Sequence, residues 1–280
     1  HSVLNPGRTL SFWKPRIDAR LETSKRGQLR LLAERKVSQL NFNNFVPSYN
    51  VFNDRIDGGN PALRPEQIWN FEIGYQHRLG GDVGFLEGKL FYQSINDPID
   101  FSPLQPGSAV VTAQGNLGRA KLYGGEAKAS VRLVALGLRD AVVSLRGLLQ
   151  DSQVRDAFTN RDRRLRADTK YAFDIGFRHD VRKLRLAYGF DYKNFGAAAP
   201  QIDLFTSDFY RIGPQLEAFA EYRLSKWLLV RLEAQNIRSG NQYRTREVFA
   251  PDKTSGQLVR FDDGVERRAA RYAVKLKGSF

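Results

Sequence analysis

The chain has 280 residues, a net charge of +14, a pI near 10.0 and a mean hydropathy of −0.47. It contains no cysteine, which excludes a disulfide framework and a thiolate metal site. It also lacks any run of the roughly 18 to 20 apolar residues that a transmembrane helix needs. A membrane protein built from strands stays compatible with this composition, because alternating strands average to a modest hydropathy.

The positive charge is spread along the whole chain, and no RNP-type motif, zinc finger or basic helix accompanies it. This distribution favours a polar interior and loops that meet anionic lipid headgroups or an anionic ligand over a nucleic-acid-binding surface. The first residue is His1, the chain has no methionine, and no signal peptide is visible. We therefore expect a processed chain or a piece of a longer protein.

The last ten residues show the pattern that recurs through the chain. Apolar residues alternate with polar or small ones, and the apolar set is Tyr272, Val274, Leu276 and Phe280. Successive side chains of a strand point to opposite faces, so this segment is predicted to be a strand with one apolar face. The same period-2 rule predicts about eleven strands, near residues 16–23, 28–41, 69–79, 83–95, 120–134, 141–150, 171–178, 184–193, 212–224, 228–235 and 271–280. Residues 83–95 are apolar on both parities, which indicates either two apolar faces or a bulge.

The predicted connections alternate between a few residues and many. The long ones are residues 42–65, 96–118, 151–167, 194–208 and 236–266. In an up-and-down sheet this places all short turns at one end and all long loops at the other, which is typical of an outer-membrane barrel. Such a sheet has to close, because lipid cannot satisfy an open edge. Eleven strands would put the first and last in the same direction, so either the count is off by one or the chain is part of a larger barrel.

Several segments resemble TonB-dependent outer-membrane receptors of Gram-negative bacteria. Asn60-Pro-Ala-Leu-Arg-Pro-Glu66 resembles the NPxLxPE segment of that family, and Asn116 to Glu126 resembles the strand that follows it. Leu232 to Ile237 resembles a late strand end, and the terminal Phe280, together with Tyr272, Val274 and Leu276, resembles the assembly signal of these barrels. Gly278 and Ile237-Arg238 depart from the usual residues.

The resemblance implies an all-β fold, a transmembrane antiparallel up-and-down barrel segment. The family barrel has about 22 strands around a plugged lumen. Residues 1–280 would then supply the C-terminal half, without the plug domain and the TonB box. It also implies a multi-pass location in the bacterial outer membrane.

No catalytic constellation is visible, and we predict neither enzyme activity, nor a cofactor, nor a metal site. The histidines are His1, His77 and His179, which do not cluster in the sequence. The acidic residues Glu126, Glu217, Glu221 and Glu233 are expected to face the lumen and to pair with Arg132, Arg223 and Arg231. A proton relay through these carboxylates is the alternative.

Ligand contacts are expected in the long outer loops. The candidates are Phe45, Tyr49, Phe52, Arg55, Arg161, Arg163, Arg164, Arg166, Phe205, Tyr210, Gln242, Tyr243 and Arg244. The Arg161–Arg166 cluster is suited to bidentate binding of anionic groups. The alternative for each residue is a solvated loop position or a contact with lipopolysaccharide phosphate.

The expected function is a share in the uptake of a large, scarce ligand such as a metal chelate, a vitamin or a glycan. The expected partners are the N-terminal barrel half with its plug, a TonB-type energy-coupling protein, outer-membrane lipid and lipopolysaccharide, and further outer-membrane subunits, but no nucleic acid. A passive channel or an anchoring barrel is one alternative function. A soluble basic β protein that binds nucleic acid is another.

Overall fold

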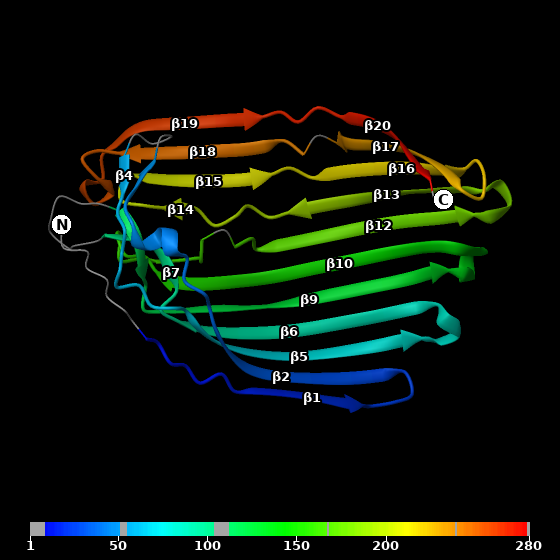
Figure 1. Cartoon of the computed structure of the whole chain (residues 1–280), viewed down its shortest axis with the longest axis horizontal. Coiled ribbons are helices and arrows are strands. Elements are labelled where there is room, and N and C mark those ends of the chain that lie inside the picture. The colour runs from blue at the N-terminus through cyan, green and yellow to red at the C-terminus, as the bar shows by residue number, and fades with distance from the viewer. Residues whose placement is uncertain (1–8, 51–54, 104–111, 167, 239, 279–280) are drawn as a thin grey trace.

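The computed structural model describes residues 9–50, 55–103, 112–166, 168–238 and 240–278. Its main feature is an antiparallel sheet in which eleven strands follow one another along a single path (Figure 1). In spatial order they are β1 (Arg16–Glu22), β2 (Gly27–Val37), β5 (Gln67–Leu79), β6 (Gly84–Asn96), β9 (Arg119–Leu133), β10 (Leu138–Arg155), β12 (Tyr171–Val181), β13 (Leu186–Phe195), β16 (Gln215–Arg223), β17 (Leu228–Arg238) and β20 (Arg271–Gly278).

The two ends of this path are open edges. Within the described part of the chain, β1 pairs only with β2, and β20 only with β17. Because neighbouring strands are antiparallel and the path has eleven members, β1 and β20 run in the same direction. The predicted number of about eleven main strands is confirmed. The sheet is part of a barrel and does not close on itself.

The connections are sorted by length as predicted. The short ones lie at the right-hand end of the sheet in Figure 1, where β20 also ends. Three of them are 3₁₀ turns: η2 (Gly80–Asp82), η3 (Val134–Leu136) and η4 (Arg182–Leu184). The η3 turn is followed by Gly137, whose φ of 77° lies in the left-handed region that glycine adopts at no steric cost.

The long connections lie at the other end and contain structure of their own. They form β3 (Ser48–Asn50), β4 (Arg55–Asp57), β7 (Ile99–Pro103), β8 (Thr112–Asn116), β11 (Asp162–Arg163), β14 (Gln201–Ile202), β15 (Thr206–Ile212), β18 (Gln242–Phe249) and β19 (Leu258–Glu266), with the 3₁₀ turns η1 (Phe42–Phe45) and η5 (Lys253–Ser255). The β7–β8 hairpin falls where the sequence suggested one, although the tip near Val110 lies outside the described residues.

The prediction of a loop over residues 194–208 is wrong, whereas the long connection predicted over residues 236–266 is present but contains strands. These segments contribute β14, β15, β18 and β19, which form a second, four-stranded antiparallel sheet. The predicted strand over 212–224 is also divided, because Gly213-Pro214 separates β15 from β16, and a proline has no N–H to donate to a ladder. Every residue of β19 is solvent-exposed, so no buried face imposes a clear alternation on it.

Large apolar side chains of the main strands are exposed on one face of the sheet. Val274 and Leu276 of β20 are 69% and 70% exposed, and Phe71, Ile73 and Tyr75 of β5 are exposed in the same alternating way. An exposed apolar surface of this extent marks contact with a membrane or a partner. The alternation predicted from the sequence therefore describes an outward apolar face and an inward polar face.

β6 carries apolar side chains on both faces, although its inner face also holds Glu87 and Lys89, and it has no bulge. Its pairing with β5 and with β9 is continuous from Gly84 to Asn96. Leu86 and Leu90 are exposed outward, whereas Phe91 lies on the inner face beneath the Lys89 ammonium, 5.7 Å from its ring centre. Of the two explanations for residues 83–95, apolar residues on both faces or a bulge, the structure supports the first.

A charged substitution on the outward face tests whether that face meets lipid. Ile73→Arg near the middle of β5 is expected to destabilise the intact barrel in lipid vesicles by about 2–4 kcal/mol, because an arginine at the bilayer midplane faces hydrocarbon. Gln76→Arg, three residues on and on the inner face, is the matched control and should change the free energy of unfolding by about 0.5 kcal/mol or less. Denaturant titration in vesicles measures both, and equal effects would contradict the assigned faces.

Candidate functional site

The inner face of the sheet carries carboxylates that each contact several cations. Glu126 on β9 lies 2.7 Å from Arg146, 3.4 Å from Lys128 and 3.6 Å from Lys89. Lys89 in turn reaches Glu72 on β5 at 3.8 Å. The neighbouring strands thus share one continuous set of ion pairs across the inner wall.

A second such cluster lies on β16, β17 and β20. Arg231 bridges Glu221 and Glu233, Arg178 from β12 donates to Glu221 at 2.9 Å, and Lys275 reaches Glu233 at 2.6 Å. Of the three arginines predicted to pair with the inner carboxylates, only Arg231 does so among the described residues. Arg132 and Arg223 make no such pair there, because cross-strand register, which the sequence does not display, decides the neighbours.

An aromatic ring lies within the second cluster. The guanidinium carbons of Arg231 and Arg178 lie 4.2 Å and 5.4 Å from the centre of the Phe219 ring. A Cβ atom on Gly189 of β13 would come within 2.9 Å of this ring, so the glycine leaves room for it. Cations above an aromatic face are attracted by the ring quadrupole, and the arrangement holds both arginines against the wall.

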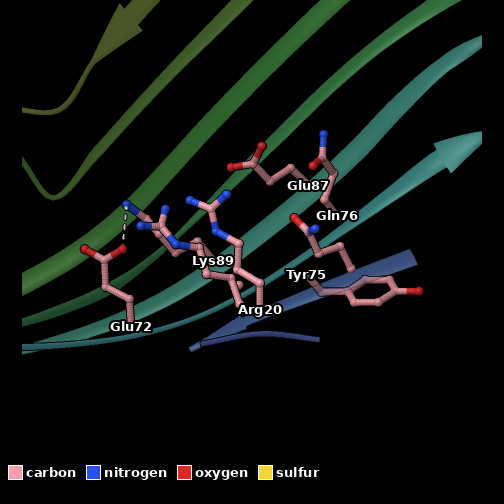
Figure 2. Close-up of a pocket in the computed structure, with 9 residues that line it drawn as sticks. Arg20, Glu72, Tyr75, Gln76, Glu87 and Lys89 are labelled. Carbon is pink, nitrogen blue, oxygen red and sulfur yellow. Dashed lines mark ion pairs between the residues drawn. The ribbon is translucent and has the colours of Figure 1, made fainter. Parts of the chain in front are cut away.

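Figure 2 shows a polar pocket on the inner side of β1, β2, β5 and β6, with a volume of about 240 Å³. Arg20, Glu72, Gln76, Glu87 and Lys89 gather around it, whereas the ring of Tyr75 lies apart from them. The pocket mixes charges of both signs and suits a polar segment or solute. Within the described residues no group of three or more histidine or carboxylate side chains could hold a metal ion.

The predicted arginine cluster lies at the long-loop end, and most of it is engaged within the protein. Arg163 is only 8% exposed and lies 2.7 Å from Asp156 and 2.9 Å from Asp100. Arg164 pairs with Asp151 at 3.2 Å, and Arg166 lies 3.6 Å from Asp100 and over the Phe101 ring. Arg161 is exposed.

Arg163 therefore joins the connection after β10 to β7. Burial acts to raise the pKa of Asp156, but hydrogen bonds from Arg163 and Thr159 outweigh it and hold that pKa below its ordinary value. The ion pair thus contributes fully above the ordinary aspartate pKa, and its contribution is lost as the pH falls through the lowered value.

One local motif occurs twice at this end. In Asp156-Ala-Phe-Thr159 and Asp203-Leu-Phe-Thr206 the aspartate accepts hydrogen bonds from the backbone N–H groups two and three residues later and from the threonine hydroxyl. Lys253 binds the second copy, with its Nζ 3.2 Å from the Thr206 carbonyl oxygen. Burial lowers the pKa of Lys253, against the opposing effect of Asp156 and Asp203. The sequence analysis did not single out these residues, although the repeated Asp-x-Phe-Thr was a visible signal.

The aromatic candidates fall in two places. Phe45 packs edge-on against Phe42 at 5.8 Å and borders an apolar cavity of about 1060 Å³ near Leu10, Phe12 and Leu63. Tyr210 stacks with Arg244, and Tyr243 with Arg211, on the four-stranded sheet, where Arg244 also pairs with Asp208 at 3.1 Å. Phe205 and Gln242 lie in the same region, on the 203–206 turn and at the start of β18.

The remaining candidates are placed as follows. Tyr49 lies on β3 and is exposed, and Arg55 begins β4. Phe52 and Phe280 lie outside the described residues. The other proposed assembly residues, Tyr272, Val274 and Leu276, are exposed on β20. The structure thus separates the candidates into several loop surfaces rather than bringing them into one pocket, and their contact with a ligand stays a prediction.

An open antiparallel sheet with an apolar outer face, an ion-paired inner face and sorted connections defines part of a membrane β-barrel. The family model described as "TonB dependent receptor-like, beta-barrel" matches residues 35–237. The chain belongs to this family, whose members are outer-membrane proteins of Gram-negative bacteria and act as transport receptors. The resemblance noted in the sequence is confirmed.

Solved structures share the fold at low sequence identity. The ferric enterobactin receptor PfeA of Pseudomonas aeruginosa is 16% identical with a TM-score of 0.67, over 96% of this chain and 40% of that one. The siderophore receptor PirA of Acinetobacter baumannii is 15% identical with a TM-score of 0.62, over 96% and 41%. The ferric-catecholate import receptor Fiu of E. coli K12 is 14% identical with a TM-score of 0.60, over 95% and 34%.

The chain thus spans about a third to two fifths of the length of these structures. No curated protein sequence matches it. Among the described residues, no helix has the length and apolar character to cross a membrane.

The Arg163 ion pairs predict a local effect. Arg163→Gln leaves Asp156 buried without a cation, and leaves Asp100 with only Arg166 at 3.6 Å, which is expected to cost about 3–5 kcal/mol. Because the residues join loops, the loss should appear as faster hydrogen exchange and proteolysis in β7, β8 and the connection after β10. Arg161→Gln removes a neighbouring exposed charge and should leave exchange unchanged. Equal protection in both variants would show that the buried pairs do not hold the loops.

Proposed function

We propose that this chain forms the C-terminal half of a receptor barrel of about 22 strands. The observation that supports this is the pair of parallel open edges, β1 and β20. Unpaired backbone groups facing hydrocarbon cost several kcal/mol each, so further strands have to pair with both edges. The family's plug would fill the lumen that the inner ion-paired face borders.

We infer that the assembled receptor takes up a ferric siderophore, a metal chelate, across the outer membrane. A TonB-type protein supplies the energy. Support comes from the structures that share the fold, which are described as receptors for ferric enterobactin, a siderophore or ferric catecholates. The paired aromatic and guanidinium groups at the long-loop end suit a large anionic ligand with aromatic rings.

The mechanism is gated transport without covalent chemistry. The long loops capture the ligand, the plug blocks the lumen, and a pull on the plug opens a path along the polar wall. A passive channel or an anchoring barrel would use the same wall without energy coupling. The outward apolar face and the membership of an outer-membrane family argue against the alternative of a soluble nucleic-acid-binding protein.

Uptake in cells separates these functions. A strain that depends on the intact receptor should accumulate radiolabelled iron from a ferric catecholate, and deletion of TonB should abolish this accumulation. A passive channel would let small solutes enter at the same rate in both strains. Iron uptake that persists without TonB would contradict the receptor proposal.

The loop cations give a finer test of ligand chemistry. Arg211 is exposed, stacks on Tyr243 at 5.7 Å and makes no ion pair in the described part of the chain. Arg211→Gln is expected to weaken binding of a ferric tricatecholate to the intact receptor about tenfold, the worth of one hydrogen bond to a charged group. Titration calorimetry measures this. Lys25→Gln, in a short turn at the opposite end, is the control, and an unchanged affinity of the Arg211 variant would remove that surface from the binding site.

A further inference from the structure

Two short turns at the right-hand end of Figure 1 lie side by side. They comprise residues 181–186 between β12 and β13 and residues 223–228 between β16 and β17. Leu186 pairs with Tyr222 in the sheet, and the Arg223 N–H donates to the Arg185 carbonyl at 3.0 Å. These two turns are called the basic–apolar patch below.

The basic–apolar patch carries basic residues that no nearby carboxylate neutralises within the described part of the chain. Lys183, Arg185, Arg223 and Lys226 make no ion pair with any carboxylate in the described ranges of the chain, and neither turn contains an acidic residue. The nearby acids are engaged elsewhere, since Asp140 pairs with Arg182, and Asp180 and Glu221 pair with Arg178. Arg185 and Arg223 border a pocket of about 320 Å³ on the inner face, together with those last two acids, so they do not face lipid. Lys183 and Lys226 are exposed within the turns themselves and are available to an anionic group outside the barrel.

The same turns expose large apolar side chains. Leu184 is 62% exposed, Trp227 56% and Leu224 51%, each next to a basic residue in the sequence. They continue the outward apolar face, on which Tyr188 and Tyr222 are also exposed. Tryptophan and tyrosine gather where a membrane protein crosses the headgroup region. Apolar tips with basic neighbours are the chemistry of a segment that lies in an anionic lipid surface.

We propose that the basic–apolar patch binds the headgroup of an anionic phospholipid in the periplasmic leaflet of the outer membrane. The short turns of such barrels are periplasmic, which places the patch at that leaflet. Leu184, Leu224 and Trp227 contact the acyl boundary, while Lys183 and Lys226 contact the phosphate. The site is independent of the transported ligand, and it serves to anchor this side of the barrel in the leaflet.

The other short turns provide an internal comparison. The turn at Gly80–Asp82 carries an acid and no base. The turn at Ser24–Gly27 carries Lys25 and Arg26 but no large apolar side chain, and the Arg26 guanidinium lies against Gly80. The patch thus combines basic residues with exposed large apolar side chains. The turn at Ser24–Gly27 has the basic residues without the apolar ones.

The test is lipid retention by the intact receptor in detergent, followed by native mass spectrometry during titration with phosphatidylglycerol, phosphatidylcholine or inorganic phosphate. The wild type is expected to retain phosphatidylglycerol in preference to phosphatidylcholine. In K183Q/K226Q the preference should fall about 25-fold, from about fivefold for each lost charge. K25Q/R26Q, which removes the same charge from the comparison turn, should stay within about twofold of the wild type. Circular dichroism of each variant verifies that the barrel is intact.

Three results would overturn the proposal. Equal retention of phosphatidylcholine would show that the patch does not select a negative headgroup. Displacement of the lipid by millimolar inorganic phosphate would show a simple anion site without a lipid. An equal loss in both double variants would assign the preference to the overall charge of the periplasmic end. A third variant, L224S/W227S, should weaken phosphatidylglycerol retention while leaving all cations in place, and unchanged retention would contradict the role of the apolar tips.

Discussion

The structure depends on the need of every strand for hydrogen-bond partners in a medium without water. Hydrocarbon offers nothing to an unpaired N–H or C=O, so the backbone of a membrane sheet has to be satisfied by neighbouring strands. The eleven main strands meet this need internally through long, nearly unbroken ladders such as those of β6 with β5 and β9. β1 and β20 meet it on one side only, and for that reason the sheet implies strands beyond those it contains.

The side chains follow from the same constraint. Once the ladders fix the backbone, alternate residues have to face lipid or lumen, and the charged ones are compatible only with the lumen. There they neutralise one another across strands, as Glu126 does with Lys89, Lys128 and Arg146. The resulting wall is polar but largely self-paired, so a solute or a plug can lie against it without leaving an uncompensated charge. Ion pairs of this kind depend on register, because a shift by one residue would turn each partner to the other face.

The two ends of the barrel segment differ in whether their basic residues are paired with carboxylates. At the long-loop end, Arg163 is buried between two aspartates, and Lys253 joins the β18–β19 connection to the 203–206 turn. Each of these contacts joins two connections that are separate in the sequence. At the short-turn end, Lys183 and Lys226 are left without carboxylate partners in the described part of the chain, beside exposed apolar tips. Charge therefore stabilises structure at one end and remains available for a partner at the other.

The sequence by itself determined the strands, their faces and the sorting of connections, because period-2 alternation records which side of each strand meets lipid. The alternation, together with the segments Asn60–Glu66, Asn116–Glu126 and Leu232–Ile237 in that order, indicated the family, which the family model confirms. Only the tertiary structure decided what the long connections do. The strand β19 has no buried face to impose a pattern. Lys89 pairs with Glu126, Asp100 with Arg163 and Arg178 with Glu221, although the members of each pair lie far apart in the sequence. Pairing between such residues is set by register and loop packing, which leave no periodic signal in one chain.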